Sequence, residues 1–361
     1  MKIITIVGAR PQFVKAAVVS RAIQNHNKNS EKEKIEEKII HTNQHYDANM
    51  SDIFFKEMHI PQPHYNLHIG GGLQGAMTGR MLEKIEAILI EEVPDYVLIY
   101  GDTNSTLAGA LAAVKLHIPV VHVEAGLRSF NMQMPEEINR ILADRISTLL
   151  LCPTKTAIEN LRAENITDGV CNVGDVMYDA VKFYGKLAAP SEQISALAKG
   201  KYCLATVHRA ENTDNIDRLT NIMRALDEVA VVNNIILPLH PRTRKIMAAN
   251  KIVLHNVTVI DPVGYFDILH LLKHAAAVLT DSGGMQKEAY FFAKPCFTLR
   301  DETEWVELVQ NGANILVGAD YKKIVAAVGN SKFDNNVFTK QLYGNGHSGE
   351  KIIDLLLQGR A

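Results

Sequence analysis

Short runs of apolar, largely β-branched residues alternate along the whole chain with amphipathic stretches of helical length. The runs are continuously hydrophobic, which indicates strands buried on both faces and therefore parallel sheets. In the first half of the chain, this pattern predicts strands at residues 3–7, 39–41, 96–100, 120–123 and 149–152. In the second half, it predicts strands at residues 202–207, 235–239, 257–260, 277–280 and 296–299.

Helices are predicted between these strands, at residues 77–92, 106–116, 215–232 and 284–292, with a closing helix at 349–357. Alternation of strand and helix through both halves predicts an α/β protein built from two doubly wound, Rossmann-like domains. A length of 361 residues agrees with two domains, because it exceeds what one hydrophobic core usually organises.

The boundary between the domains is expected near residues 172–178, because the segment from 172 to 201 is richer in Gly, Ala, Ser and Pro. We therefore expect an N-terminal domain over residues 1–172 and a C-terminal domain over residues 173–344. Residues 28–38 form a run of charges, which predicts a solvated helix end or a surface loop.

Composition excludes several classes of protein. A hydrophobic fraction of 47% with 22% charged residues is typical of a globular protein rather than a disordered one. The formal charge of -2 provides no basic field for a nucleic acid. No apolar run reaches the roughly 18 residues that a membrane helix needs, and the N-terminus lacks a secretory signal, so we expect a cytoplasmic protein.

The cysteines and histidines do not predict a metal or redox site. No Cys-x-x-Cys pair, His-Glu-x-x-His motif or Cys/His cluster occurs in the sequence. The four cysteines are interpreted as reduced core residues: Cys152, Cys171, Cys203 and Cys296. We therefore expect chemistry without a metal ion or another cofactor.

In parallel α/β sheets, ligands bind beyond the carboxyl ends of the strands, so the polar residues there are the candidates for chemistry. Residues 8–15 (GARPQFVK) follow the first predicted strand. Pro11 suits the first position of a helix, and Arg10 and Lys15 supply cations near its N-terminus, which predicts an anion site. The segment is neither a P-loop nor a dinucleotide fingerprint, and an ordinary turn with surface cations is the alternative.

Acidic residues follow the next strands. Asp102 comes after the third predicted strand and Glu124 after the fourth, while Glu136 and Glu137 open a later helix. Arg140 stands four residues after Glu136 on one helix face, where a cation can orient the carboxylate. Carboxylates crowded in a partly dry cleft have pKa values pushed apart, which suits one as a base and another as an acid. Capping and salt bridging are the alternative functions of this cluster.

Histidines follow two strands of the second half. Residues 206–212 (TVHRAEN) carry His208 and residues 240–244 (HPRTR) carry His240. A lone histidine is more often structural than catalytic, but a His-Arg pair at a strand end can bind a diphosphate. No Gly-x-Ser-x-Gly elbow accompanies them.

A second phosphate-site candidate lies at residues 280–289 (TDSGGMQKEA), where a predicted strand turns into a helix. Gly283 and Gly284 allow a phosphate to approach the backbone N–H groups closely, and Ser282 adds a hydroxyl donor. Glu288 lies one turn inside the helix, where it could accept hydrogen bonds from a ribose. The alternative is a helix start that needs glycine only for packing.

Together, the ordered motifs GARPQFxK, GDT, HVEAGLR, PEExNR, HRxEN and DSGGxQxE resemble the non-hydrolysing UDP-N-acetylglucosamine 2-epimerases across essentially the whole chain. The resemblance implies a GT-B fold, in which two Rossmann-like domains face each other across a cleft. It also implies a homodimer, and a C-terminal helix, within residues 345–361, that returns to the first domain.

The chemistry implied by this resemblance is the inversion of C2 in a UDP-linked N-acetylated amino sugar. UDP is eliminated from C1 and C2 to give an enzyme-held 2-acetamidoglucal, and then adds back to the other face; no cofactor takes part. A GT-B glycosyltransferase, a hydrolysing 2-epimerase and a non-catalytic nucleotide-sugar sensor remain alternatives, because fold alone does not separate them.

The resemblance also assigns roles to individual residues. The implied catalytic residues are Asp102, Glu124, Glu136 and His208, and the sequence leaves open which carboxylate takes the C2 proton. The implied substrate-binding residues are Arg10, Lys15, Arg140, His240, Ser282, Gly283, Gly284, Glu288, Arg300 and Trp305.

One segment departs from the family pattern. Residues 300–307 read RDETEWVE where the common pattern is Arg-Asp-x-Thr-Glu-Arg-Pro-Glu, so Trp305 replaces an arginine expected near the nucleotide-sugar. Residues 303–307, together with residues 101–106 and 129–132, look closer to a subfamily that resembles epimerases of UDP-2,3-diacetamido-2,3-dideoxyglucuronic acid, made for surface polysaccharide. We therefore favour that substrate over UDP-N-acetylglucosamine. Whether a second nucleotide-sugar binds as an activator stays open.

Overall fold

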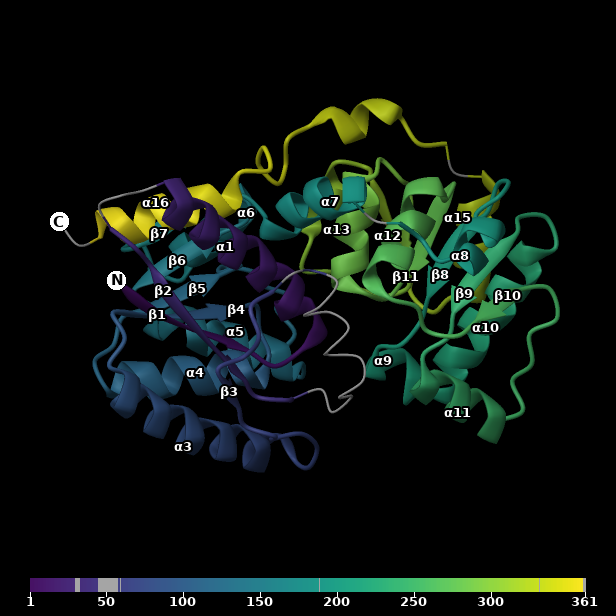
Figure 1. Cartoon of the computed structure of the whole chain (residues 1–361). Helices are drawn as coiled ribbons and strands as arrows, with labels where there is room; N and C mark the ends of the chain where they lie inside the picture. The colour runs from purple at the N-terminus through teal and green to yellow at the C-terminus, as the bar shows by residue number, and fades with distance from the viewer. Residues whose placement is uncertain (30–32, 45–57, 59, 188, 331, 360–361) are drawn as a thin grey trace. The chain divides into compact units, whose positions relative to one another are not determined.

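The chain divides into two compact units in a computed structural model. The structure describes residues 1–29, 33–44, 58, 60–187, 189–330 and 332–359, except for the side chain of Arg10. Unit 1 comprises Met1–Lys182 and Gln341–Ala361, and unit 2 comprises Phe183–Lys340 (Figure 1). Each unit contains one sheet in which all the paired strands are parallel.

Unit 1 has a seven-stranded sheet in the order β3-β2-β1-β4-β5-β6-β7. Helices α3, α4 and α5 pack together over one face, and α1 and α16 lie side by side over the other (Figure 1). The elements of this unit are β1 (Lys2–Val7), α1 (Arg10–Asn29), β2 (Glu36–His41), β3 (Tyr65–Asn66), α3 (Gln74–Glu92), β4 (Tyr96–Tyr100), α4 (Asn104–Lys115), β5 (Val120–Val123), α5 (Pro135–Ile146), β6 (Leu149–Cys152), α6 (Lys155–Ala163), β7 (Val170–Asn172) and α16 (Ser348–Gln358).

Unit 2 has a six-stranded sheet in the order β10-β9-β8-β11-β12-β13. Helix α7 (Val176–Leu187) leads into it from unit 1. The other elements are α8 (Glu192–Leu197), β8 (Cys203–Thr206), α9 (Ala210–Thr213), α10 (Ile216–Ala230), β9 (Ile235–Pro238), α11 (Pro241–Ala249), β10 (Thr258–Ile260), α12 (Tyr265–His274), β11 (Ala277–Thr280), α13 (Gly283–Phe291), β12 (Cys296–Thr298), α14 (Val306–Gln310), β13 (Asn314–Leu316), α15 (Tyr321–Asn330) and the 3-10 helix η1 (Asn335–Thr339).

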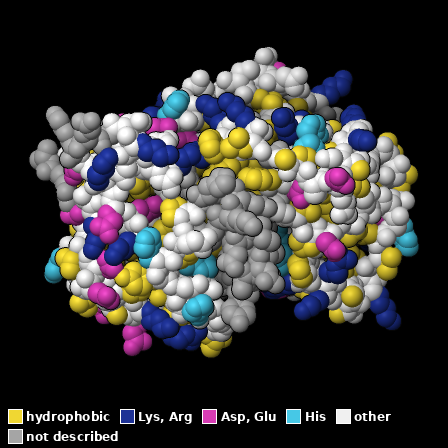
Figure 2. All heavy atoms as spheres, in the orientation of Figure 1, with side chains coloured by type: hydrophobic (Ala, Val, Ile, Leu, Met, Phe, Trp, Pro, Cys, Tyr) yellow, Lys and Arg dark blue, Asp and Glu magenta, His cyan; other side chains and the backbone are white. Residues whose placement is uncertain are grey.

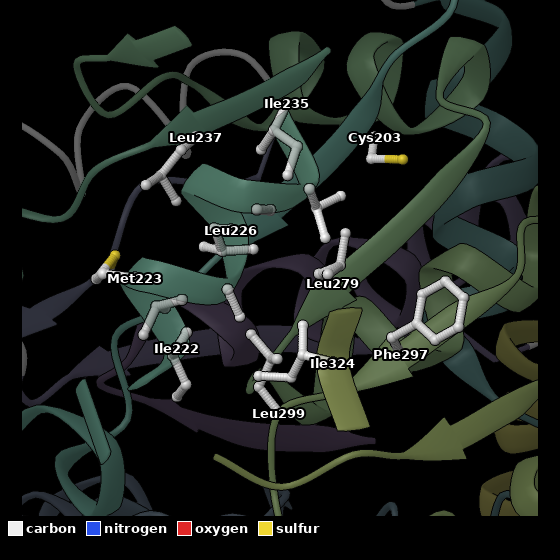
Figure 3. Close-up of a cluster of buried hydrophobic side chains, with 14 of the residues drawn as sticks. Cys203, Ile222, Met223, Leu226, Ile235, Leu237, Leu279, Phe297, Leu299 and Ile324 are labelled. Atoms are coloured by element: carbon white, nitrogen blue, oxygen red, sulfur yellow. The ribbon is translucent and has the colours of Figure 1, made fainter. Parts of the chain in front are cut away.

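Each unit has a hydrophobic core of its own. In unit 1, Ile4 and Ile6 of β1 and Ile99 of β4 pack against Met81 and Ile85 of α3. In unit 2, strand residues such as Leu237 and Leu279 pack against α10, which contributes Ile222 and Leu226 (Figure 3). All the strands predicted from continuous hydrophobicity except β10, which lies at an edge, therefore form the interior of the two sheets, and the predicted α/β class is confirmed.

Both sheets have the same doubly wound topology. In unit 1 the strand order reverses direction at β1 and β4, and in unit 2 it reverses at β8 and β11. In open α/β sheets, ligands bind beyond the carboxyl ends of the strands at such a reversal point. The turns after β1, β4 and β5 in unit 1, and after β8 and β11 in unit 2, are therefore the places to look for a site.

The crossover between the units lies within α7. The sequence placed the boundaries after residues 172 and 344, whereas the compact units divide after Lys182 and Lys340. The first part of α7 belongs to unit 1 because Asp179 Oδ2 accepts a hydrogen bond of 2.9 Å from Gly349 N at the start of α16. The closing helix α16 is thus tied to the first unit through a residue of the crossover helix.

The charged run at residues 28–38 is not wholly a surface segment. Helix α1 ends at Asn29, as expected of a solvated helix end, but strand β2 already begins at Glu36. Thr5 Oγ1 of the neighbouring strand donates a hydrogen bond of 2.6 Å to Glu37 Oε1. The prediction of a loop is therefore wrong for residues 36–38, because pairing with β1 draws them into the sheet.

The surface carries charges of both signs. Lys and Arg side chains lie interspersed with Asp and Glu over the face shown in Figure 2. Among the helices in the described part of the chain, none combines the length and the apolar character that crossing a lipid bilayer requires.

Candidate active site

The turn after β1 is fixed by the side chain of Gln12. Its Oε1 accepts a hydrogen bond of 2.8 Å from Gly8 N, and its Nε2 donates one of 2.8 Å to Tyr100 O at the end of β4. A Cβ on Gly8 would lie 2.0 Å from Thr42 Oγ1, so close packing requires glycine here. This turn leads into α1 at Arg10, whose side chain lies outside the described part of the structure.

Lys15 and Glu124 meet at the ends of β1 and β5. Lys15 Nζ, on α1, donates a hydrogen bond to Glu124 Oε1, and both side chains are buried. Gly101 lies against this ion pair, since a Cβ at that position would be 3.0 Å from Lys15 Nζ and 3.6 Å from Glu124 Oε1. The structure therefore brings together Lys15, Glu124 and the residue that precedes Asp102 at the carboxyl edge of this sheet, although Lys15 was predicted only as a cation of an anion site.

Asp102 is held by helix α5. Arg140 donates a hydrogen bond to Asp102 Oδ2, while Asn139 Nδ2 donates one of 3.0 Å to the Asp102 carbonyl oxygen. The Asp102 side chain keeps 27% of its surface exposed, whereas that of Arg140 is buried. A carboxylate that is anchored on one side and open on the other can exchange a proton with a bound ligand.

The adjacent acidic residues of α5 have different environments. Glu137 is fully buried, and its oxygens accept hydrogen bonds from Ser129 N at 2.9 Å, Phe130 N at 2.8 Å and Arg140 at 2.7 Å. Glu136 is only half-buried in the first turn of the helix. Arg140 contacts Asp102 and Glu137, so Glu137 supports the site, while the orienting contact of Arg140 with Glu136 and a catalytic role of Glu136 stay predictions.

A buried polar network lies beneath these turns, and the sequence analysis did not assign it. His122 of β5 is 0% exposed; its Nδ1 is 2.7 Å from Asp144 Oδ1 and its Nε2 is 2.7 Å from Gly101 O. Asp144 also pairs with Arg128, which forms a two-pronged ion pair with Glu164. Burial alone would raise the pKa of Asp144, but His122 and Arg128 outweigh it and lower that pKa.

In unit 2, Asp281 organises the turn after β8. This fully buried carboxylate follows β11 and accepts hydrogen bonds from His208 N at 3.0 Å and Arg209 N at 3.0 Å. Asn212 Nδ2 donates a further bond of 3.1 Å. The His208 ring remains accessible, with 41% of the side chain exposed and Nδ1 3.5 Å from Asp281 Oδ1. The two strands at the reversal point of the second sheet are thereby linked.

His240 lies beside this turn, at the end of β9. Its ring centroid is 6.3 Å from that of His208. Its Nδ1 accepts a hydrogen bond of 3.2 Å from Arg242 N at the start of α11, which leaves Nε2 as the protonated nitrogen of the neutral ring. The histidines predicted from the ends of two strands are therefore neighbours in space.

The N-terminus of α13 has the form of an anion site. Ser282 is its N-cap and accepts a hydrogen bond of 3.4 Å from Met285 N. A Cβ on Gly283 would lie 2.1 Å from Glu304 Oε1, whereas one on Gly284 would meet only Ser282 Oγ at 4.0 Å. Gly283 is thus required by packing, while a side chain at Gly284 would have room; the N–H groups at such a helix N-terminus favour an anion.

The predicted residues near position 300 are buried together. Arg300 donates a hydrogen bond of 2.8 Å to Glu304; burial lowers the pKa of Arg300, but the Glu304 carboxylate outweighs this and raises it. Trp305 is only 2% exposed, and Lys287 Nζ lies 4.0 Å from the centroid of its ring. Glu288 is also buried. Roles of Arg300, Trp305 and Glu288 in binding stay predictions, and Lys287 is a neighbour of Trp305 that the sequence analysis did not identify.

Among the described residues, no group of three or more His, Cys, Asp or Glu side chains has the arrangement of a metal site. The polar groups gathered in each unit are instead carboxylates, cations and backbone N–H groups. In unit 1 they can move a proton and hold an anion, and in unit 2 they can bind phosphate.

Comparison with known proteins identifies relatives over the whole chain. The family model described as "UDP-N-acetylglucosamine 2-epimerase" matches residues 27–357. A protein of Pseudomonas aeruginosa named UDP-2,3-diacetamido-2,3-dideoxy-D-glucuronate 2-epimerase is 53% identical over 360 residues, which cover 99% of this chain and 99% of that protein.

Solved structures of UDP-GlcNAc 2-epimerases are also similar to this chain over nearly its full length. A crystal structure of a Methanocaldococcus jannaschii UDP-GlcNAc 2-epimerase in complex with UDP-GlcNAc and UDP is 45% identical, has a TM-score of 0.91, and covers 99% of this chain and 100% of that one. A UDP-GlcNAc 2-epimerase from Neisseria meningitidis bound to UDP-GlcNAc is 30% identical, has a TM-score of 0.87, and covers 99% and 100% of the two chains.

Proposed function

Because the chain belongs to the UDP-N-acetylglucosamine 2-epimerase family, we propose that it inverts the configuration at C2 of a UDP-linked N-acetylated amino sugar. One observation carries the proposal beyond family membership. Glu124, paired with Lys15, and Asp102, paired with Arg140, follow the adjacent strands β5 and β4, of which β4 borders the reversal point of the first sheet. Two such groups can remove a proton from one face of a carbon and deliver one to the other face.

The substrate that we propose is UDP-2,3-diacetamido-2,3-dideoxyglucuronate, converted to its manno epimer as a precursor of surface polysaccharide. The Pseudomonas aeruginosa protein named for this reaction supports the proposal, being 53% identical over nearly the full length of both chains. UDP-N-acetylglucosamine is the second candidate. The Methanocaldococcus jannaschii structure, 45% identical and in complex with UDP-GlcNAc and UDP, favours it.

In the proposed mechanism, a carboxylate of unit 1 removes the C2 proton while the bond between C1 and the UDP oxygen breaks. The C1–C2 double bond of a 2-acetamidoglucal forms, and UDP carries the electron pair away. In the reverse step UDP adds to C1, and a second acidic group protonates C2 from the other face. Asp102, Glu124 and Glu136 are the candidate groups, and the ion pairs with Arg140 and Lys15 hold the Asp102 and Glu124 side chains in place.

Unit 2 is proposed to bind the UDP. The N-terminus of α13 suits a phosphate, because its N–H groups and dipole favour negative charge and Gly284 places no side chain there. Ser282 would add a hydroxyl, Glu288 would bind the ribose, and His208 and His240 would contact the diphosphate. Stabilising the departing diphosphate in this way lowers the barrier to elimination.

The elimination and re-addition of UDP in this mechanism contains no hydride transfer, so we propose that no redox cofactor takes part. We also propose a homodimer acting in the cytoplasm, and we include a second nucleotide-sugar as a possible activator in the assay below. The four cysteines, all of them free thiols, support a reducing compartment.

The test is proton NMR of the purified protein in heavy water with each candidate sugar in a separate tube. Deuterium entering C2 of one sugar, together with a second anomeric signal from its epimer, is the expected result and identifies the substrate. If neither sugar is labelled, with or without added UDP-N-acetylglucosamine as an activator, the epimerase proposal fails. Release of free sugar would instead indicate a hydrolysing enzyme.

The variant Glu124→Gln tests whether Glu124 takes part in proton transfer without taking part in UDP binding. The substitution keeps the shape of the side chain but removes a group that can transfer a proton, so kcat should fall by at least about 100-fold. UDP affinity, measured by calorimetry, should change less than about threefold, because the proposed phosphate site lies in unit 2. An equal loss of UDP affinity would contradict this role of Glu124.

A further inference from the structure

The imidazole of His122 lies in the interior of unit 1, between the two turns that carry Asp102 and Glu124. The residue belongs to β5, and its ring is completely buried. Toward β4, Nε2 is 2.7 Å from the carbonyl oxygen of Gly101, and toward α5, Nδ1 is 2.7 Å from Asp144 Oδ1. The ring therefore bridges a strand end and a helix through two short contacts.

Both contacts fix the ring as a donor. A carbonyl oxygen can only accept a hydrogen bond, and the Asp144 carboxylate also accepts, with Arg128 at 2.7 Å stabilising its negative charge. Both nitrogens of His122 must then carry a hydrogen, which makes the ring a cation. Two cations, His122 and Arg128, then balance two anions, Asp144 and Glu164, in one connected buried network.

The network touches both candidate catalytic turns. Gly101, whose carbonyl oxygen accepts from His122, directly precedes Asp102 and has a left-handed φ of 61°. At the other turn, Asp144 Oδ2 accepts a hydrogen bond of 3.1 Å from Gly126 N, two residues beyond Glu124. Glu124 itself has a φ of 72°, which is strained for a residue with a side chain and needs support from its surroundings.

We propose that His122, through its two hydrogen bonds, is a positioning residue that sets the separation of the Asp102 and Glu124 turns. This inference rests on the proposed catalytic use of those two carboxylates. His122 touches neither carboxylate, so its effect is on geometry. Because a displacement of about 1 Å at a reacting group costs on the order of 100-fold in rate, loss of the bridge should reduce kcat strongly.

Two conservative variants separate the two hydrogen bonds. In His122→Gln the side-chain amide nitrogen can occupy the place of Nε2 and donate to Gly101 O, whereas in His122→Asn it can occupy the place of Nδ1 and donate to Asp144. We expect kcat to fall by about 100-fold in His122→Asn and by no more than about tenfold in His122→Gln. KM and UDP affinity should stay within about threefold in both, because the proposed UDP site is in unit 2.

Asp179→Asn is the matched control. Asp179 is another buried carboxyl group of unit 1; it is bonded to Gly349 N in α16 and belongs to neither the turn after β4 nor the turn after β5. This variant should lower the melting temperature without changing kcat, which separates positioning from loss of stability. If both His122 variants keep kcat within threefold of wild type, or if Asp179→Asn lowers kcat as much as His122→Asn does, the proposal is overturned.

Two measurements hold even if neither UDP-sugar reacts, so a failure of the proposed function is distinguishable from a failure of this inference. With nitrogen-15 histidine, the wild-type protein should show two protonated ring nitrogens for one histidine at pH 7.5, and His122→Gln should remove that signal. Crystal structures of wild type and His122→Asn should differ in the separation of the Asp102 and Glu124 carboxyl groups. A singly protonated ring, or unmoved carboxyl groups, would overturn the proposal.

Discussion

Glu37 shows how a single carboxyl group can oppose the stability of the fold to which it belongs. Burial raises its pKa, and the hydrogen bond of 2.6 Å from Thr5 Oγ1 only partly offsets this effect. The folded protein therefore holds the Glu37 proton more tightly than the unfolded chain does. Stability from this group is fully present below the unfolded pKa and is lost as the pH rises through the folded one.

Replacing Glu37 by Gln should remove this pH dependence. At pH 4, where the wild-type carboxyl group is mostly protonated, the two proteins should melt at similar temperatures. At pH 8 the variant should be more stable by roughly 1 kcal/mol, because no buried charge forms. Thermal unfolding followed by circular dichroism across this pH range measures the difference.

Glu36→Gln is the control for that experiment. It removes the same formal charge from the adjacent position of β2, but its side chain is largely exposed. Its difference in melting temperature from wild type should not change between pH 4 and pH 8. A parallel change in both variants would mean that net charge, rather than burial of Glu37, causes the effect.

At the same scale, the sequence predicted which polar side chains follow the strands, but it did not predict the hydrogen-bond partners of those side chains. Asp102, Glu124 and Ser282 could be found because each lies within two residues of the end of an apolar run. His122 interrupts such a run and could have been noticed by that signal, yet its bond to Asp144 depends on a contact 22 residues away in sequence. Such partners follow from the packing of helices on the sheet, which local sequence does not encode.

At the scale of elements, the strands that the sequence analysis missed are β3, β7 and β13. All three lie at the edges of their sheets, where a strand has a partner on one side only. They are two or three residues long and partly exposed, so they lack the continuous hydrophobicity of interior strands. The interior strands and the helices between them could be predicted because burial on both faces imposes that pattern.

The two glycines that begin α13 should respond differently to a methyl group. In Gly284→Ala the new Cβ meets only Ser282 Oγ at 4.0 Å, so the melting temperature should stay within about 2 °C of wild type. If a phosphate of UDP lies against this turn, the same methyl group should obstruct it and weaken UDP binding at least about tenfold, as measured by calorimetry.

Gly283→Ala provides the contrast. Its Cβ would lie 2.1 Å from Glu304 Oε1, so the side chain that pairs with Arg300 must move and the protein should be destabilised by about 1–3 kcal/mol. Undiminished UDP affinity in Gly284→Ala would remove this helix N-terminus from the proposed phosphate site.

At the scale of the whole molecule, the two units share one strand order, and the C-terminal segment of the chain belongs again to unit 1. Relative to its own first strand, each sheet has the order 3-2-1-4-5-6, with β7 added to the first. The sequence predicted the two Rossmann-like units from repeated alternation, whereas the division within α7 could not be located from composition. It depends on bonds such as Asp179 to Gly349, which join residues 170 positions apart.

Because residues 341–361 belong to unit 1, we expect their removal to unfold unit 1 but not unit 2. In α16 the apolar side chains of Ile352, Ile353 and Leu356 are buried, and the helix packs on α1. Their exposure would cost on the order of 5 kcal/mol, comparable with the whole stability of a domain. A chain ending at Lys340 should therefore lose the fold of unit 1 and all epimerase activity.

Unit 2 keeps its sheet, its core and the whole of α13 in the same truncated chain. Calorimetry should then find UDP bound within about fivefold of the wild-type affinity, although circular dichroism reports a loss of helix. A chain ending at Gln358 keeps α16 intact and should match wild type in both respects. If UDP binding is lost together with the fold of unit 1, residues of unit 1 are needed to bind the nucleotide. The proposal that unit 2 alone binds UDP would then be wrong.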